Sequence, residues 1–188
     1  MAPIGSLLVN PTYDLSRAIE ISSKVIGVIE KTHREPELFG RAFNVYSLLL
    51  AQKGLSIGLL GNFKEGEALC EKGLRFANLI NHLPSMGFVE MCYSILFNIK
   101  GDGRNILKHA EQGIKHCEEA EASVVKALAT LSLGAGYYFM GKLDNAQKHV
   151  NRSLQIQKEI NSNVMITTYY IFFGMIFLDL KEYNKAQN

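Results

Sequence analysis

Small and apolar positions return at a fixed interval along most of the chain. Glycine stands at Gly61, Gly101 and Gly141, at intervals of 40 residues, and Lys181 takes the next place. Seven residues before each of these positions lies a small residue, and four residues before it lies a large apolar one. The small set is Gly54, Ser94, Gly134 and Gly174, and the large set is Ile57, Phe97, Tyr137 and Phe177. Three full periods and the start of a fourth align without a gap, which indicates a tandem repeat.

The apolar residues of each repeat are spaced by three or four positions, which predicts two helices separated by a short turn at the glycine. We call the helix before the glycine helix A and the helix after it helix B. Helices A are expected at 37–60, 84–100, 121–140 and 163–180, and helices B at 62–81, 103–118 and 142–160. The chain then divides into repeat one (37–81), repeat two (84–118), repeat three (121–160) and a partial repeat four (163–188).

An unpaired helix is expected before the repeats, at residues 14–31, after an irregular stretch over 1–13. Asp14 can cap its first turn, and its apolar residues again follow helical spacing. The pattern breaks over 32–36, because the residue before Pro36 disfavours helix. This helix is typical of the second helix of a repeat whose first helix is missing.

The best-preserved copy of the pattern contains Leu133, Gly134, Tyr137, Gly141, Ala146, Val150, Ser153 and Leu154. A glycine inside a helix costs on the order of 1 kcal/mol relative to alanine, so its recurrence at fixed places indicates helices in close contact. The order Leu-Gly, an aromatic residue three positions later, a turn glycine and then alanine resembles the tetratricopeptide repeat. Repeat two departs most from this pattern, with Ser94, Gly103 and Ile106 at its small, aromatic and alanine positions.

The resemblance implies an all-α fold, a right-handed superhelix of antiparallel helix pairs. The interval of 40 residues exceeds the 34 of the ordinary repeat. We expect the extra residues to lengthen helix A and the joint between repeats, such as 81–85. Long repeats of this kind are similar to the sensor arrays of large bacterial and archaeal signalling ATPases and of maltose-operon-type transcription activators. The resemblance therefore implies an array that senses an inducer or docks a protein, although no GxxxxGK[ST] phosphate-binding motif occurs in the sequence.

In this family helix A lines the concave wall of the superhelix, which identifies a candidate partner-binding wall. Its members are Leu48, Ala51, Leu55, Leu59, Phe88, Met91, Ile95, Asn98, Leu128, Leu131, Ala135, Tyr138, Thr168, Ile171, Met175 and Leu178. The lysine, asparagine and arginine clamp of chaperone-docking members is missing from this set, so binding of a chaperone tail is rejected. Two interpretations of the apolar wall stay open. Either the helices A pack on one another and leave little groove, or the wall binds a partner helix, a peptide or an apolar effector, or forms a dimer face.

Composition and charge narrow the classes of function. The 188 residues are 47% hydrophobic with a formal net charge of +2, which indicates a folded domain without the electrostatic footprint of a nucleic-acid or membrane-binding protein. The sequence has neither an apolar run long enough to span a membrane nor a signal peptide. Three cysteines without a CxxC pair favour a cytoplasmic location. The last predicted helix A has no helix after it, so we expect a fragment of a longer protein that self-associates through 163–188.

Candidate chemistry is sparse, and we expect no enzymatic activity, cofactor or metal. His109 and His116 are interpreted as surface histidines, because no third or fourth metal ligand accompanies them. Cys70 and Cys117 are expected to point inward as small apolar residues. The acidic stretch 118–121 is expected to favour the start of the next helix. In each of the aromatic pairs 137–138 and 169–170, one ring is expected to pack, which leaves the other free to face the groove.

Three functional hypotheses follow. The first is a protein-interaction or sensor module of a larger cytoplasmic signalling or transcription-regulatory protein. The second is a receptor domain in which a small effector or signalling peptide shifts the population of superhelix conformations. The third is an accessory domain of an enzyme whose active site lies elsewhere.

Overall fold

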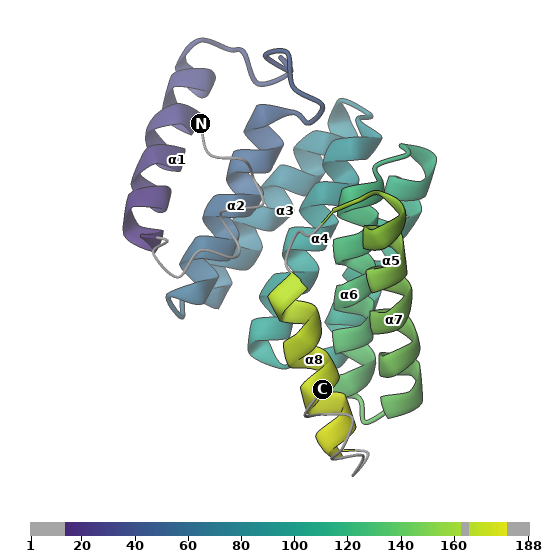
Figure 1. Cartoon of the computed structure of the whole chain (residues 1–188). Coiled ribbons are helices and arrows are strands. Elements are labelled where there is room, and N and C mark those ends of the chain that lie inside the picture. The colour runs from purple at the N-terminus through teal and green to yellow at the C-terminus, as the bar shows by residue number, and fades with distance from the viewer. Residues whose placement is uncertain (1–13, 163–165, 180–188) are drawn as a thin grey trace.

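The computed structural model describes residues 14–162 and 166–179, which form eight helices (Figure 1). These are α1 (Leu15–Lys31), α2 (Val45–Leu59), α3 (Phe63–Leu79), α4 (Leu83–Lys100), α5 (Gly103–Glu119), α6 (Ser123–Phe139), α7 (Leu143–Glu159) and α8 (Ile166–Asp179). No strand occurs within these two ranges. The all-α class predicted from the sequence is confirmed.

The helices pack in chain order as antiparallel pairs. α2 packs on α3, α4 on α5 and α6 on α7, and each pair is joined by a short turn (Figure 1). The helices A, which are α2, α4, α6 and α8, also contact one another in succession. The helices B, which are α3, α5 and α7, make no such contacts with each other, and each packs between two helices A. The apolar interior is therefore shared along the row of helices A.

Each turn in this array contains one residue with a left-handed backbone. The turns after helices A use Gly61, Gly101 and Gly141, with φ of 95°, 70° and 70°. The turns after helices B use Asn81, Glu121 and Asn161, with φ of 49°, 53° and 50°. A left-handed residue thus occurs at every twentieth position from 61 to 161, and glycine is the residue best suited to this conformation. The sequence pattern identified the first set alone.

The equal spacing of these turns corrects the expected helix lengths. α3, α5, α6 and α7 have 17 residues each, and α4 has 18. The joint between α3 and α4 holds only residues 80–82. The prediction that the long repeat extends helix A and the joint is therefore wrong, because both helices of the pair share the added length.

The first helix A begins later than predicted. Residues 37–44 were expected to be helical, but α2 starts at Val45. Asn44 is fully buried, and its Oδ1 accepts a hydrogen bond from the Ser47 N–H at 2.9 Å while its Nδ2 donates to the Glu35 carbonyl at 2.8 Å. The Asn44 side chain therefore caps α2 and fixes the preceding loop, and this use of its polar atoms ends the loop at residue 44.

The recurring small residues lie where helices cross most closely, as the sequence predicted. A Cβ atom added to Gly54 would lie 2.6 Å from the Gly66 carbonyl oxygen, and one added to Gly134 would lie 2.8 Å from Cγ2 of Val150. Ser94 is fully buried at the same place in repeat two, and its hydroxyl donates to the Met91 carbonyl at 2.7 Å. These positions exclude larger side chains because the two helices of each pair touch through their backbones there.

Candidate functional site

The predicted wall is divided among three apolar clusters. Seven of its members are buried, namely Ala51, Leu55, Phe88, Met91, Leu128, Leu131 and Ala135. Ala51, Phe88, Met91 and Leu128 belong to one cluster, Leu131 and Ala135 to a second, and Leu55 to a third. These side chains fill the contacts between successive helices A and between the helices of each pair. A partner could reach them only by separating helices.

The remaining described members of the wall are at least partly accessible. Leu48, Ile95, Asn98, Tyr138 and Met175 are half-buried, and Leu59, Ile171 and Leu178 are exposed. The side chain of Thr168 lies outside the described residues. Leu59, Asn98, Tyr138 and Leu178 all lie at the C-terminal ends of helices A. The accessible part of the wall is thus concentrated near the turns that follow these helices.

Further exposed apolar side chains lie at the same edge of the array. We call Leu59, Leu60, Ile99, Phe139 and Met140 the turn row. Leu59, Ile99 and Phe139 are 40 residues apart and precede equivalent turns. The second and third turns touch, because a Cβ added to Gly101 would lie 3.8 Å from Cε1 of Phe139. The repeat therefore places apolar side chains at equivalent positions of one accessible edge, a pattern that was not predicted although the interval of 40 residues contains it.

His109 contradicts the sequence interpretation of a surface histidine. It is buried between α4 and α5, and its Nδ1 lies 2.6 Å from Oε2 of the buried Glu90. Its ring stacks on Tyr93 at 4.2 Å and on Phe97 at 5.4 Å between ring centroids. The signal was present in the sequence, because His149 and Tyr137 stand 40 residues after His109 and Phe97 and also stack, at 5.1 Å. A histidine on helix B packed on an aromatic residue of helix A is thus a feature of repeats two and three.

Other candidate groups also have structural partners. Glu118 forms an ion pair with Lys126 at 2.8 Å, so this acidic residue joins α5 to α6. Tyr137 packs on His149, as expected for one ring of its pair, and a hydrogen bond to Asp179 raises the pKa of Tyr138. The ring of Tyr169 lies outside the described side chains. His116 is half-buried, and its Nδ1 is enclosed without a hydrogen-bond partner in the described structure.

The cysteines are buried, and burial opposes the ionisation of their thiols. Cys70, Cys92 and Cys117 are free thiols with almost no exposed surface. Burial raises the pKa of Cys70 and of Cys117 to about 12, and it raises the pKa of Cys92 well above its usual value. A thiol needs to ionise in order to act as a nucleophile. Cys70 and Cys117 therefore serve as the small inward residues that the repeat register predicted.

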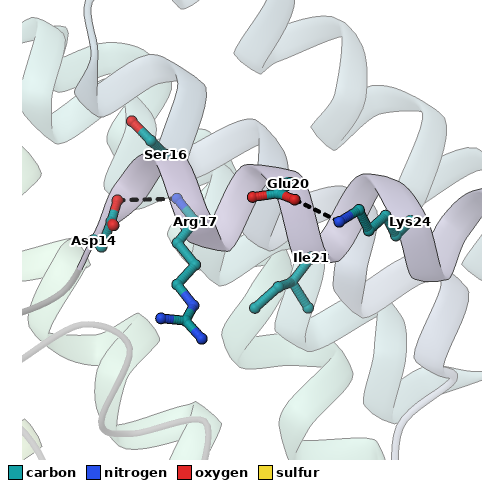
Figure 2. A pocket seen from close by; sticks show the side chains of 6 residues that line it. All are labelled: Asp14, Ser16, Arg17, Glu20, Ile21 and Lys24. Atoms are coloured by element: carbon teal, nitrogen blue, oxygen red, sulfur yellow. Dashed lines mark hydrogen bonds and ion pairs between the residues drawn. The ribbon is translucent and has the colours of Figure 1, made fainter.

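A shallow hollow lies along the first helix (Figure 2). It has a volume of about 500 Å³ and is open to solvent, and its lining comes from α1 and its N-terminal cap: Asp14, Ser16, Arg17, Glu20, Ile21 and Lys24. Asp14 Oδ1 accepts a hydrogen bond from the Arg17 N–H at 2.9 Å, and Glu20 is paired with Lys24. These groups form the helix cap and a surface ion pair, and an open hollow on one helix gives a small ligand little enclosure.

Residues 14–162 and 166–179 contain neither a cluster of metal ligands nor a membrane-spanning helix. No group of three or more His, Cys, Asp or Glu side chains there is arranged to hold a metal ion. No helix in this part of the chain is both long enough and apolar enough to cross a membrane.

Comparison with known proteins gives no family assignment. No model of a known protein family matches the sequence, and no curated protein matches it significantly.

Proposed function

We propose that the chain is a non-enzymatic binding scaffold of the tetratricopeptide type, whose helix pairs form a right-handed superhelix and whose partner is a protein or peptide. The observation that carries this proposal is the periodic turn row, because apolar side chains recur at equivalent accessible positions of successive repeats. Clustered apolar side chains on a protein surface usually mark an interaction site. The buried state of His109 and of the three thiols leaves these groups without access to a substrate.

We place the partner at the turn row and at the adjoining accessible members of the wall, Asn98 and Tyr138. Side chains recurring along one edge suit an extended or helical segment that presents apolar residues at regular intervals. The buried members of the wall then act as the core that fixes the spacing of the turns. A receptor for a small effector is less well supported, because the hollow on α1 is open and lined by one helix.

We further propose that this scaffold belongs to a larger cytoplasmic signalling or transcription-regulatory protein. Three buried free thiols are compatible with a reducing compartment. The interval of 40 residues is similar to that of the long sensor arrays of such regulators.

The test is selection of binding peptides from a displayed random library with the immobilised 188-residue chain. Each selected peptide is titrated against the unmodified chain and against the variants Leu59→Asp and Phe139→Asp. We expect the affinity to fall at least about tenfold in both variants, because a charge would replace an apolar contact. Circular dichroism should show unchanged helix content, since both side chains are exposed.

The matched control is Leu79→Asp. Leu79 is 79% exposed at the C-terminal end of a helix B, on the opposite edge of the array. We expect this variant to bind every selected peptide with unchanged affinity. Peptides that bind equally well to all three variants would contradict the assignment of the turn row, and failure to select any peptide would contradict the scaffold proposal.

A further inference from the structure

The first helix has the local features of a helix B. α1 has 17 residues, as do α3, α5 and α7. Its cap Asp14 accepts a hydrogen bond from the N–H three residues later, as Asn62 and Asp102 do for α3 and α5. His33 then takes the left-handed conformation with φ of 50°, at the place that Asn81 occupies after α3. The cap, the length and the turn thus fix the register between α1 and the other helices B.

This register explains which apolar side chains of α1 are exposed. Counted from the start of each helix, Ile21 is at the position that His109 and His149 have in α5 and α7. Val28 is at the position that Phe76 has in α3. In the repeats these positions pack on the helix A that precedes them, as Phe76 does on Tyr46 with 4.9 Å between ring centroids. No described helix precedes α1, and Ile21 and Val28 are 50% and 61% exposed. α1 therefore presents the face that receives a helix A.

The last described helix presents the complementary face. Tyr170 in α8 takes the place of Glu90, which contacts His109 on the following helix B. Gly174 takes the place of Gly54 and Gly134, which touch α3 and α7. Tyr170 is 63% exposed, and a Cβ added to Gly174 would meet no described atom within 4 Å. α8 therefore presents the face that receives a helix B.

We propose that two copies of this chain assemble head to tail, with α1 of one copy packed on α8 of the other in the register of the pairs α2/α3, α4/α5 and α6/α7. In this register Ile21 of one copy lies against Tyr170 of the other, as His109 lies against Glu90 within the chain. The interface continues the A-to-B packing already present three times in the structure.

This pairing also brings two opposite charges to one end of the contact, where the carboxylate of Asp14 is engaged in capping α1. Antiparallel packing places the N-terminal turn of α1 beside the C-terminal end of α8. Arg17 lies in that turn, and Figure 2 shows its side chain projecting from the same side of α1 as Ile21. Asp179, the single charged residue of α8, is the last residue of that helix, so it comes to the same end of the contact as Arg17 of the other copy. The interface is heterologous, so a docked pair still has one free α1 face and one free α8 face, and association can continue into longer oligomers.

The test uses sedimentation velocity of the full 188-residue chain and of the single variants Ile21→Asp and Tyr170→Asp. The unmodified chain should form oligomers of the 21.0 kDa monomer, and their average mass should increase with concentration through the micromolar range. Each variant alone should remain at 21.0 kDa, because one of its two faces is blocked. An equimolar mixture should form a dimer and nothing larger, because Ile21→Asp retains its α8 face and Tyr170→Asp retains its α1 face.

Each alternative arrangement gives a different result that overturns the proposal. If two α8 faces paired with each other, Ile21→Asp alone would still dimerise. If residues 180–188 of the same copy covered α8, the unmodified chain would be monomeric at every concentration. If the mixed variants stayed monomeric, the two faces would not be complementary.

The control Leu79→Asp should associate like the unmodified chain, and unchanged circular dichroism should show that the variants fold. Peptide binding at the turn row uses other residues, so the two proposals fail independently.

Discussion

At the scale of single residues, glycines determine how closely paired helices approach. Gly54 and Gly66 face each other across the α2/α3 crossing, and an added Cβ on either would lie 2.6 Å from the carbonyl oxygen of the other. That oxygen belongs to the backbone and cannot turn aside as a flexible side chain would. Gly27 in α1 differs, because an added Cβ there meets nothing within 4 Å. The same substitution should therefore have opposite effects at the two positions.

We predict that Gly66→Ala destabilises the chain by about 1–3 kcal/mol, because α2 and α3 must separate. Gly27→Ala should instead stabilise it by about 0.5–1 kcal/mol through the higher helix propensity of alanine. Urea denaturation followed by circular dichroism measures both changes. Equal stability of the two variants would show that the crossing at Gly66 is not tightly packed.

The buried pair Glu90–His109 is the second important residue-scale feature. It joins α4 to α5 inside an aromatic stack, and neither side chain has much contact with water. A buried polar group that loses its partner retains its desolvation cost. Repeat three keeps the histidine but has Thr130 in place of the glutamate, so the carboxylate belongs to repeat two alone.

Glu90→Ala should lower the free energy of unfolding by roughly 2–4 kcal/mol, because it leaves His109 unpaired and opens a cavity. Glu111→Ala, at an exposed position of α5, should change it by less than about 0.5 kcal/mol. Chemical denaturation of both variants measures the difference. A loss below about 1 kcal/mol for Glu90→Ala would contradict a role of the pair in joining the helices.

At the scale of helices, the sequence predicted their number and most of their ends. Asp14 and the turn glycines supplied local signals that do not depend on the rest of the fold. The error at 37–44 has a tertiary cause, because Asn44 donates to loop carbonyls and its own N–H donates to Ser85 Oγ at 2.8 Å, 41 residues away. The apolar spacing that predicted a helix from residue 37 could not reveal that competition. The pairing of His109 with Glu90 was missed for a similar reason, since Glu90 lies on another helix, although the aromatic stack of this histidine recurs at the interval of 40 residues.

The three N-terminal helices are tied together at Glu30. This carboxylate on α1 accepts hydrogen bonds from Lys72 Nζ on α3 at 2.9 Å and from the Tyr46 hydroxyl on α2 at 2.6 Å. The bonds from Lys72 and Tyr46 lower the pKa of Glu30 below its ordinary value of 4.5. Its stabilising contribution is therefore complete above pH 4.5 and disappears as the pH falls through the lowered value.

We predict that Lys72→Met destabilises the chain at neutral pH by about 1 kcal/mol or less, because the pair is partly exposed and screened by water. The difference from the unmodified chain should shrink as the pH falls below 4.5 and through the lowered pKa of Glu30, because the carboxylate is then protonated in both proteins. Urea denaturation across the acid range measures this dependence. A difference that does not change with pH would show that Lys72 acts through its contact with the Tyr46 ring and not through its pairing with Glu30.

At the scale of the whole molecule, the structure divides the predicted wall into a buried core and an accessible edge. The repeat period in the sequence could not distinguish these two parts. The sequence placed the sixteen wall residues on one side of the helices A, but helical spacing carries no information about how successive helices A approach each other. The contacts of α2 with α4 and of α4 with α6 enclose Ala51, Met91 and Leu128. The turn row stays accessible because it lies at the helix ends. The repeat was therefore visible in the sequence, whereas the accessible surface depended on the packing between repeats.

Leu131→Asp and Ile171→Asp distinguish core from surface among the wall residues. Leu131 is 4% exposed, so we predict a loss of about 3–5 kcal/mol or failure to fold when an unpaired carboxylate replaces it. Ile171 is 57% exposed, and its substitution should change stability by less than about 1 kcal/mol. Thermal unfolding of both variants provides the comparison. Similar melting temperatures for the two would contradict the division of the wall into buried and accessible parts.

The most direct test of the scaffold account is a map of backbone amide chemical shifts during titration of the labelled chain with a selected peptide. We predict that the largest changes occur at the three turns after helices A, around Leu59–Gly61, Ile99–Gly101 and Phe139–Gly141, and that the helix centres stay unchanged. Changes confined to the opposite edge around Asn81 and Glu121, or to the hollow on α1, would contradict the account.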